Sequence, residues 1–165
     1  MDTPEFHIEF ARYPDHLADL RAVREPVFIV EQSVPPELEW DTDDAISTHV
    51  IARTSEGTPI GVARLTPQHG IGRMAVLVPW RKRGVGSALL QALIDKAREL
   101  GYPALELHAQ THAIGFYERF GFSAFGPEYD EAGIPHRSMR RSLDPAPDES
   151  TLRETNSFSE LTDLI

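Results

Sequence analysis

The 165-residue sequence contains no cysteine. This absence excludes disulfides, thiolate metal sites and a cysteine nucleophile, and it agrees with a cytoplasmic location. No apolar run approaches the ~20 residues that a transmembrane helix needs. The segment from Met1 to Phe10 also lacks the basic and apolar regions of a secretory signal. We therefore expect a cytoplasmic protein that does not associate with a membrane.

Positive charge is also scarce, because the chain carries a net charge of -10. Such a chain is a poor general binder of nucleic acid, since phosphate contacts need clustered lysine and arginine. Half of the excess negative charge lies between Asp144 and Ile165. Against this background the run Arg81-Lys82-Arg83 stands out. It predicts a local anion site and no nucleic-acid partner.

Residues 1–143 have the periodicity of a mixed α/β domain. Alternating or β-branched apolar runs predict strands at Phe6–Phe10, His49–Arg53, Ile60–Leu65, Ile71–Val78, Ala104–His108, Phe122–Phe125 and Pro135–Arg141. The last two strands should be joined by a loop that contains Asp130 and Gly133. Helical spacing predicts one long helix from Val85 to Leu100 that ends at Gly101, and a short one over Thr111–Arg119. A further helix should begin after Asp15 as its N-cap and break near Glu25, because Pro26 follows.

The sequence beyond residue 143 changes in composition. Residues 144–157 are acidic and rich in proline, which is typical of a linker. In the final segment, 158–165, four apolar residues share one helical face: Phe158, Leu161, Leu164 and Ile165. We expect this face to pack on the domain, on a second copy in a homodimer, or on another domain.

A strand, a Gly-rich turn and a helix follow one another from Met74 to Leu100. This arrangement binds phosphate, because the backbone N–H groups at a helix start lack intrahelical acceptors and the helix dipole is positive there. Gly84 and Gly86 allow a ligand to approach the backbone closely. Taken alone, the turn could equally be a flexible basic loop. A dinucleotide fingerprint or a P-loop would need residues that are missing here.

Two segments in the right order resemble a known family. The pattern Arg81-x-x-Gly84-x-Gly86 resembles motif A of the GNAT superfamily of N-acetyltransferases, and Ala113–Phe122 resembles its motif B. The stretches 27–32, 107–111 and 132–136 resemble the ElaA-like branch. The resemblance implies a mostly antiparallel central sheet flanked by helices, with a splayed pair of parallel strands at the acyl-CoA site.

The resemblance also implies which residues bind the cosubstrate, acetyl-CoA. A bulge in the first strand of the pair would leave backbone groups of Ala75, Val76 and Val78 for the pantetheine arm. The pyrophosphate would lie on the turn, and the start of motif B would complete the site. The remaining expected contacts are Arg81, Arg83, Gly84, Val85, Gly86, Ser87, Gln110, Ala113, Phe116 and Tyr117. Gln110 stands where the family usually has a shorter asparagine.

The implied reaction transfers an acetyl group from acetyl-CoA to a primary amine of a small molecule or peptide. The backbone N–H of Val76 would polarise the thioester carbonyl, and Tyr117 would protonate the leaving thiolate. Packing beneath the sheet is the alternative role for Tyr117. We take Glu31 as the general base, with four other candidates left open: Asp41, Asp44, His49 and His108.

Further expectations concern the acceptor, metal binding and the activity. The acids around Trp40 could attract a cationic amine or form a solvated loop. We expect no metal site, because His108 and His112 have no third ligand in view. A non-catalytic acyl-CoA sensor is the alternative function. Acceptor choice should depend on two segments, 31–44 and 129–136.

Overall fold

The computed structural model describes residues 5–143. Two compact units make up the chain: an N-terminal unit, Met1–Lys96, and a C-terminal unit, Ala97–Ile165. The predicted linker, 144–157, and the apolar segment, 158–165, lie outside the described residues. Their roles therefore stay predictions.

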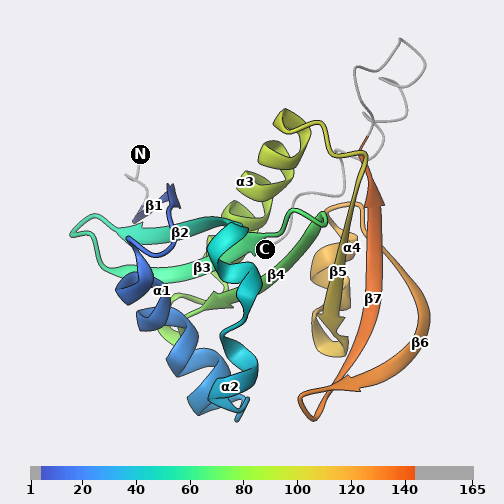
Figure 1. The fold of residues 1–165 in the computed structure, drawn as a ribbon, viewed down its shortest axis with the longest axis horizontal. Helices are drawn as coiled ribbons and strands as arrows, with labels where there is room; N and C mark the ends of the chain where they lie inside the picture. The colour runs from blue at the N-terminus through green and yellow to red at the C-terminus, as the bar shows by residue number, and fades with distance from the viewer. Residues whose placement is uncertain (1–4, 144–165) are drawn as a thin grey trace. The chain divides into compact units, whose positions relative to one another are not determined.

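The N-terminal unit contains an antiparallel four-stranded sheet (Figure 1). Its strands follow chain order: β1 Phe6–Ala11, β2 Thr48–Thr54, β3 Pro59–Leu65 and β4 Gly70–Val76. All four strands predicted for this part are confirmed. Strand β4 ends before the predicted limit of Val78, because Val78–Trp80 turns into the short 3-10 helix η3 with Pro79 in its first turn.

Helices cover both faces of this sheet. Helix α1, Leu17–Arg24, continues directly into η1, Glu25–Glu31, a π-helix. Their buried residues Leu20, Val23 and Val27 share a core cluster with residues of β2, β3 and β4. The predicted break near Glu25 is thus a change of helix type at Pro26, which has no N–H to donate to the preceding helical turn.

Two local predictions in this region need correction. The N-cap of α1 is His16 and not Asp15, and the His16 ring contacts the backbone of Arg12. The acidic segment forms two short helices, α2 Pro36–Glu39 and η2 Thr42–Ile46, and η2 carries a capping box between Asp41 and Asp44.

The long predicted helix is confirmed as α3, Val85–Glu99. Its start packs closely on β3, because a Cβ atom added at Gly61 would lie 2.8 Å from Val85 Cγ1. Glycine therefore permits this approach of strand and helix. Beyond the helix, Gly101 has the positive φ of +78° expected for a residue that ends a helix.

The C-terminal unit has a three-stranded antiparallel sheet in the order β5–β7–β6. Its strands are β5 Ala104–Gln110, β6 Ser123–Glu131 and β7 Ile134–Ser142. Between β5 and β6 lie η4, Thr111–Ala113, and α4, Ile114–Glu118. The loop expected around Asp130 is wrong: only Ala132 and Gly133 connect β6 to β7, both with positive φ, as in a tight hairpin turn.

Candidate active site

The predicted anion-binding turn lies at the start of α3. Lys82 and Gly84 both have positive φ, 62° and 85°, so the chain reverses sharply before the helix. The first helical hydrogen bond runs from Ala88 N–H to the Gly84 carbonyl, at 3.0 Å. The N–H groups of the first helical turn, which begins at Val85, therefore have no acceptor within the helix. The geometry is that of an anion site at a helix start.

The basic residues of the turn differ in their surroundings. Lys82 and Arg83 are exposed. The Arg83 guanidinium lies 4.9 Å from the centre of the Trp80 ring and 3.1 Å from a carboxylate oxygen of Glu5. An exposed ion pair of this kind contributes ~0–1 kcal/mol, so an incoming phosphate can displace it at low cost.

Arg81 makes a different set of contacts. Its Nη1 and Nη2 donate to the two carboxylate oxygens of Glu31 at 2.8 and 2.7 Å, and its Nε donates to the Val76 carbonyl at 2.8 Å. Arg81 therefore ties the end of η1 to the end of β4. The hydrogen bond from Arg81 lowers the pKa of Glu31, which makes that carboxylate a weaker base while the pair holds.

Strand β4 contains the bulge that the resemblance implied. Gly72 pairs with Arg64 and Ala75 pairs with Val62, so two residues of β4 face one of β3. The first of these two residues, Arg73, has a φ of +51°. For a residue with a side chain this conformation costs about 1–2 kcal/mol. Other contacts must therefore hold the bulge in place.

The bulge and the register decide which backbone groups face β3. The Leu77 N–H donates to the Ile60 carbonyl at 2.9 Å, so Ala75 and Val62 form the next hydrogen-bonded pair. The backbone groups of Ala75 face β3. Those of Val76 face the opposite way, and the Val76 carbonyl accepts from Arg81. The orientation of the Val76 N–H suits the predicted oxyanion role, whereas Ala75 uses its backbone within the sheet.

A partly buried cluster of three arginines and three acids stabilises the bulge. Arg24, 1% exposed, donates to the carboxylates of Glu39 at 2.6 Å and Asp44 at 2.8 Å. Arg64 and Arg73 complete the cluster: Arg64 binds Asp41 and Asp44, and Arg73 binds Asp41 and the carbonyls of Leu38 and Glu39. Arg73 is the residue of the bulge with positive φ, so these contacts stabilise its backbone.

The cluster corrects the prediction for the acidic segment. Glu39 and Asp44 are buried and paired with Arg24, so these two acids belong neither to a solvated loop nor to an open cation site. The hydrogen bond from Arg64 lowers the pKa of Asp41. Burial lowers the pKa of His49, whose Nε2 lies 2.7 Å from the Asp44 carbonyl. Arg64 and Arg73 are single charges within apolar strands and Arg24 lies among other charged residues of α1, so the sequence carried no signal for their pairing.

Tyr117 lies on α4 in the C-terminal unit. Its ring meets Phe116 and Phe122 edge-on, with centroids 5.0 and 6.2 Å away. Burial raises the pKa of Tyr117 to about 12, so the phenol stays protonated at neutral pH and can donate a proton. Two more predicted cosubstrate contacts lie at the helix starts before Tyr117. Gln110 is the N-cap of η4, and Ala113 is the N-cap of α4.

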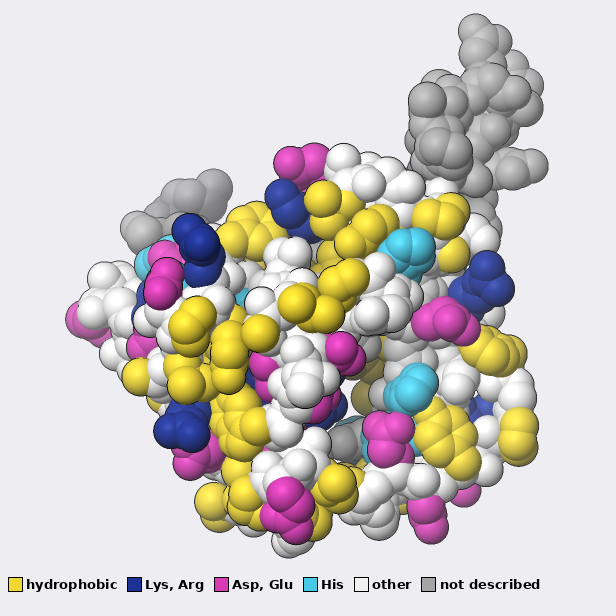
Figure 2. Space-filling model, viewed as in Figure 1, with side chains coloured by type: hydrophobic (Ala, Val, Ile, Leu, Met, Phe, Trp, Pro, Cys, Tyr) yellow, Lys and Arg dark blue, Asp and Glu magenta, His cyan; other side chains and the backbone are white. Residues whose placement is uncertain are grey.

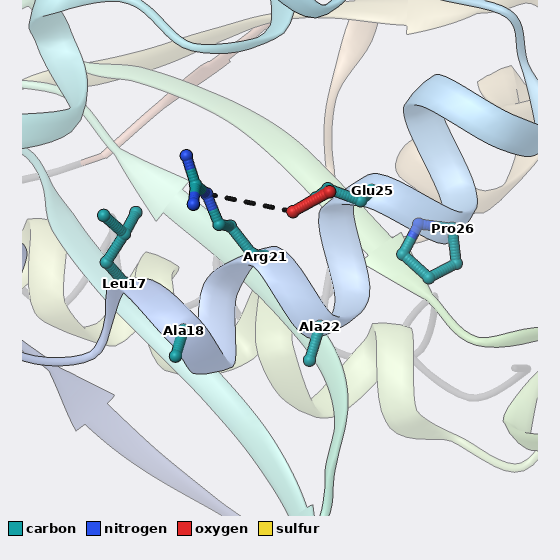
Figure 3. Close-up of a pocket in the computed structure, with 6 residues that line it drawn as sticks. All are labelled: Leu17, Ala18, Arg21, Ala22, Glu25 and Pro26. Atoms are coloured by element: carbon teal, nitrogen blue, oxygen red, sulfur yellow. Dashed lines mark ion pairs between the residues drawn. The ribbon is translucent and has the colours of Figure 1, made fainter.

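A surface hollow is also present in the described residues. It is an open depression of about 590 Å³ on α1 and η1 (Figure 3), lined by Leu17, Ala18, Arg21, Ala22, Glu25 and Pro26. Arg21 and Glu25 form an ion pair of 3.8 Å across it. None of the predicted site residues lines this hollow. Within residues 5–143 there is also no cluster of acids and histidines that could hold a metal ion, and no helix suited to crossing a bilayer.

A family model for an acetyltransferase (GNAT) domain matches residues 17–143. The chain belongs to the GNAT acetyltransferase family. The uncharacterized N-acetyltransferase YjcF of Bacillus subtilis is 36% identical over 135 residues, which cover 79% of this chain and 96% of YjcF. These matches confirm the predicted family and the prediction of an N-acetyltransferase.

Solved structures of related acetyltransferases have a similar fold. An acyl-CoA N-acyltransferase from Pseudomonas aeruginosa has a TM-score of 0.73 at 29% identity, over 83% of this chain and 99% of that one. Escherichia coli ElaA has a TM-score of 0.73 at 26% identity, with the same coverage. The predicted GNAT-type α/β fold and the resemblance to ElaA are thus confirmed.

Proposed function

We propose that this acetyltransferase moves the acetyl group of acetyl-CoA to a primary amine of a small molecule or peptide by direct attack. The observation that carries the proposal is the arrangement of β4. A bulge turns the Val76 N–H away from β3, at the end of a strand that leads into an anion-binding turn. This combination supplies an oxyanion donor and a phosphate site on one continuous segment.

The residues of the turn fit the pyrophosphate of coenzyme A. We assign Arg83, Gly84, Val85, Gly86 and Ser87 to this role. Lys82 adds charge, because its side chain is exposed beside them. We assign Arg81 an indirect role, because its guanidinium already binds Glu31 and the Val76 carbonyl. Its role is to position the strand end.

The rest of the cosubstrate site follows from the same assignment. Val78, a residue that is 62% exposed on η3, would contact the pantetheine arm. In the C-terminal unit, Gln110, Ala113 and Phe116 would bind the cosubstrate at the start of the η4–α4 segment. Each of these contacts is a prediction that a complex with coenzyme A would test.

In the proposed reaction the amine nitrogen attacks the thioester carbon and forms a C–N bond. The carbonyl oxygen gains negative charge, which the Val76 N–H stabilises, and the C–S bond then breaks. Tyr117 donates its phenolic proton to the departing thiolate. An enzyme that holds both reactants in line gains much of its rate from that alignment.

The test is release of free thiol from acetyl-CoA in the presence of a panel of primary amines. Turnover with at least one amine supports the enzyme. Tight binding of acetyl-CoA without turnover of any amine would favour the alternative, a sensor of acyl-CoA. The variant Tyr117→Phe should lose about 10²–10⁴-fold in kcat. Tyr102→Phe is the matched control, because Tyr102 lies outside the assigned residues and should keep full activity.

Two further proposals rest on sequence alone. A cytoplasmic location agrees with the cysteine-free chain. A homodimer or domain partner would engage the apolar residues between 158 and 165.

A further inference from the structure

Four side chains from three strands of the C-terminal unit meet on one face of its sheet. His108 comes from β5, Tyr129 and Glu131 from β6, and His136 from β7. Figure 2 shows histidine and acidic side chains gathered over β5 and the β6–β7 hairpin. Their register agrees, because Tyr129 pairs with His136, and His136 pairs with Gln110, two residues beyond His108 on the same face.

The carboxylate of Glu131 lies between the two imidazoles. Its Oε1 is 3.0 Å from His108 Nδ1, and its Oε2 is 3.8 Å from His136 Nε2. The carboxylate accepts the Nδ1–H of His108, so the neutral ring keeps its lone pair on Nε2. A histidine oriented in this way by a carboxylate is poised to take up a proton through Nε2.

Contacts between neighbouring rings limit the side-chain conformations of the cluster. His136 is buried, 6% exposed, and its Nδ1 lies 2.7 Å from the Ile134 carbonyl, to which it donates. Tyr129 stacks on His136 with centroids 6.1 Å apart and meets His108 edge-on at 5.8 Å. A surface ion pair that formed by chance would have no such supporting rings. His108 itself remains 57% exposed and accessible to a substrate.

A bulge in β6 places Tyr129 and Glu131. Phe125 pairs with Ser138 and Tyr129 with His136, so three residues of β6 face the single residue Arg137. Arg137 stabilises this bulge, because its Nε and Nη2 donate to the Gly126 carbonyl at 3.1 and 2.9 Å. Bulges next to functional sites re-aim side chains, and this one immediately precedes the two residues of the cluster.

The cluster and Tyr117 lie on opposite faces of the same sheet. Arg141, which pairs with Leu105, donates to the Phe120 carbonyl at 2.7 Å, so the end of α4 lies on the Leu105 face. Side chains alternate along a strand, and His108 therefore points to the other face. One strand, β5, thus separates a proton donor from a candidate proton acceptor.

We propose that His108, oriented by Glu131, is the general base that deprotonates a cationic amine acceptor, and that this face of the sheet is where the acceptor binds. The inference rests on the proposed acetyl transfer. The acceptor class is an amine protonated at neutral pH. Glu131 provides the negative charge and Tyr129 the aromatic ring that would attract such a cation.

The protons balance as follows. His108 Nε2 removes one proton from the ammonium and releases it to solvent. The neutral amine then attacks the thioester carbon, and the nitrogen loses a second proton when the amide forms. The thiolate takes the phenolic proton of Tyr117. The second proton lost by the nitrogen then reprotonates Tyr117. The net products are the acetylated amine, coenzyme A thiol and one proton.

The experiment compares kcat/KM for His108→Gln and Glu131→Gln with wild type, together with acetyl-CoA affinity by calorimetry. We expect a loss of about a hundredfold or more for His108→Gln, about tenfold or more for Glu131→Gln, and unchanged affinity. Glu56→Gln, which changes an exposed carboxylate outside the assigned residues, should behave as wild type. The His108→Gln defect should shrink with an arylamine acceptor, which is already neutral at neutral pH.

The outcomes separate this inference from the proposed function. Near-wild-type turnover by His108→Gln would overturn the base assignment while acetyl transfer stands. A loss that is equal for alkylamines and the arylamine would also overturn it, because deprotonation of the acceptor would then not be the defect. If wild type itself transfers no acetyl group to any amine, both proposals fall. Should His108→Gln misfold, Glu131→Gln alone decides.

Discussion

Gly61 offers the sharpest test of how the sheet positions the turn from Arg81 to Gly86, which we propose binds acetyl-CoA. It lies on β3 and pairs with Val76, under the first turn of α3. A Cβ atom at this position would lie 2.8 Å from Val85 Cγ1, 3.0 Å from Leu89 Cδ1 and 3.4 Å from the Ala75 carbonyl oxygen. The change Gly61→Ala therefore pushes the start of the helix away from the strand.

The expected size of the effect follows from these distances. Favourable carbon contacts lie at about 3.5–4.0 Å, so the helix start must move by roughly 1 Å or Val85 must leave its rotamer. Overpacking of this kind costs about 1–3 kcal/mol. Replacing glycine by alanine returns about 0.4–1 kcal/mol through the unfolded chain. The net loss should be about 1–2 kcal/mol, or about 2–8 °C in the midpoint of thermal unfolding for a chain of this size.

The same displacement should weaken acetyl-CoA binding, because Val85 and its neighbours carry the N–H groups that we propose bind the pyrophosphate. Thermal unfolding and calorimetric titration with acetyl-CoA measure the two effects. Gly72→Ala is the control: it lies on the adjacent strand, and nothing lies within 4 Å of an added Cβ. If Gly61→Ala matches Gly72→Ala in both midpoint and affinity, the proposed link from strand packing to the turn is wrong.

Three other changes test the site. Arg24→Met should cost about 3–5 kcal/mol in urea unfolding, because it removes the buried guanidinium that donates to both Glu39 and Asp44; a loss near zero would show that the cluster does not stabilise the fold. Tyr117 has its pKa raised from 10.0 to about 12, so its contribution to stability is present below pH 10 and is lost as the pH rises toward 12. Tyr117→Phe should remove that part of the alkaline decline, and an unchanged pH–stability curve would contradict the buried phenol. Glu31→Gln should keep most of kcat if Glu31 only holds Arg81, whereas a loss as large as that of His108→Gln would make Glu31 the base.

Much of the fold could be predicted because its signals are local. The strand runs, the amphipathic pattern of α3 and the glycines at 84, 86 and 101 each act within a few residues. Two predictions in these regions were wrong. The N-cap moved by one residue to His16, and the β6–β7 hairpin proved tighter than its polar sequence indicated. Hairpin register depends on pairing across strands, and composition does not report it.

The candidate site also has features that the sequence predicts and features that depend on the tertiary structure. By itself the sequence determined the helix that begins at Val85, and it predicted the turn from Arg81 to Gly86 and the role of Tyr117 from motifs formed by neighbours along the chain. Only the tertiary structure decided that Arg81 binds Glu31, 50 residues away, and that Glu131 orients His108 across a sheet. Charge pairing depends on distance in space, and a charged residue in a sequence carries no record of its partner.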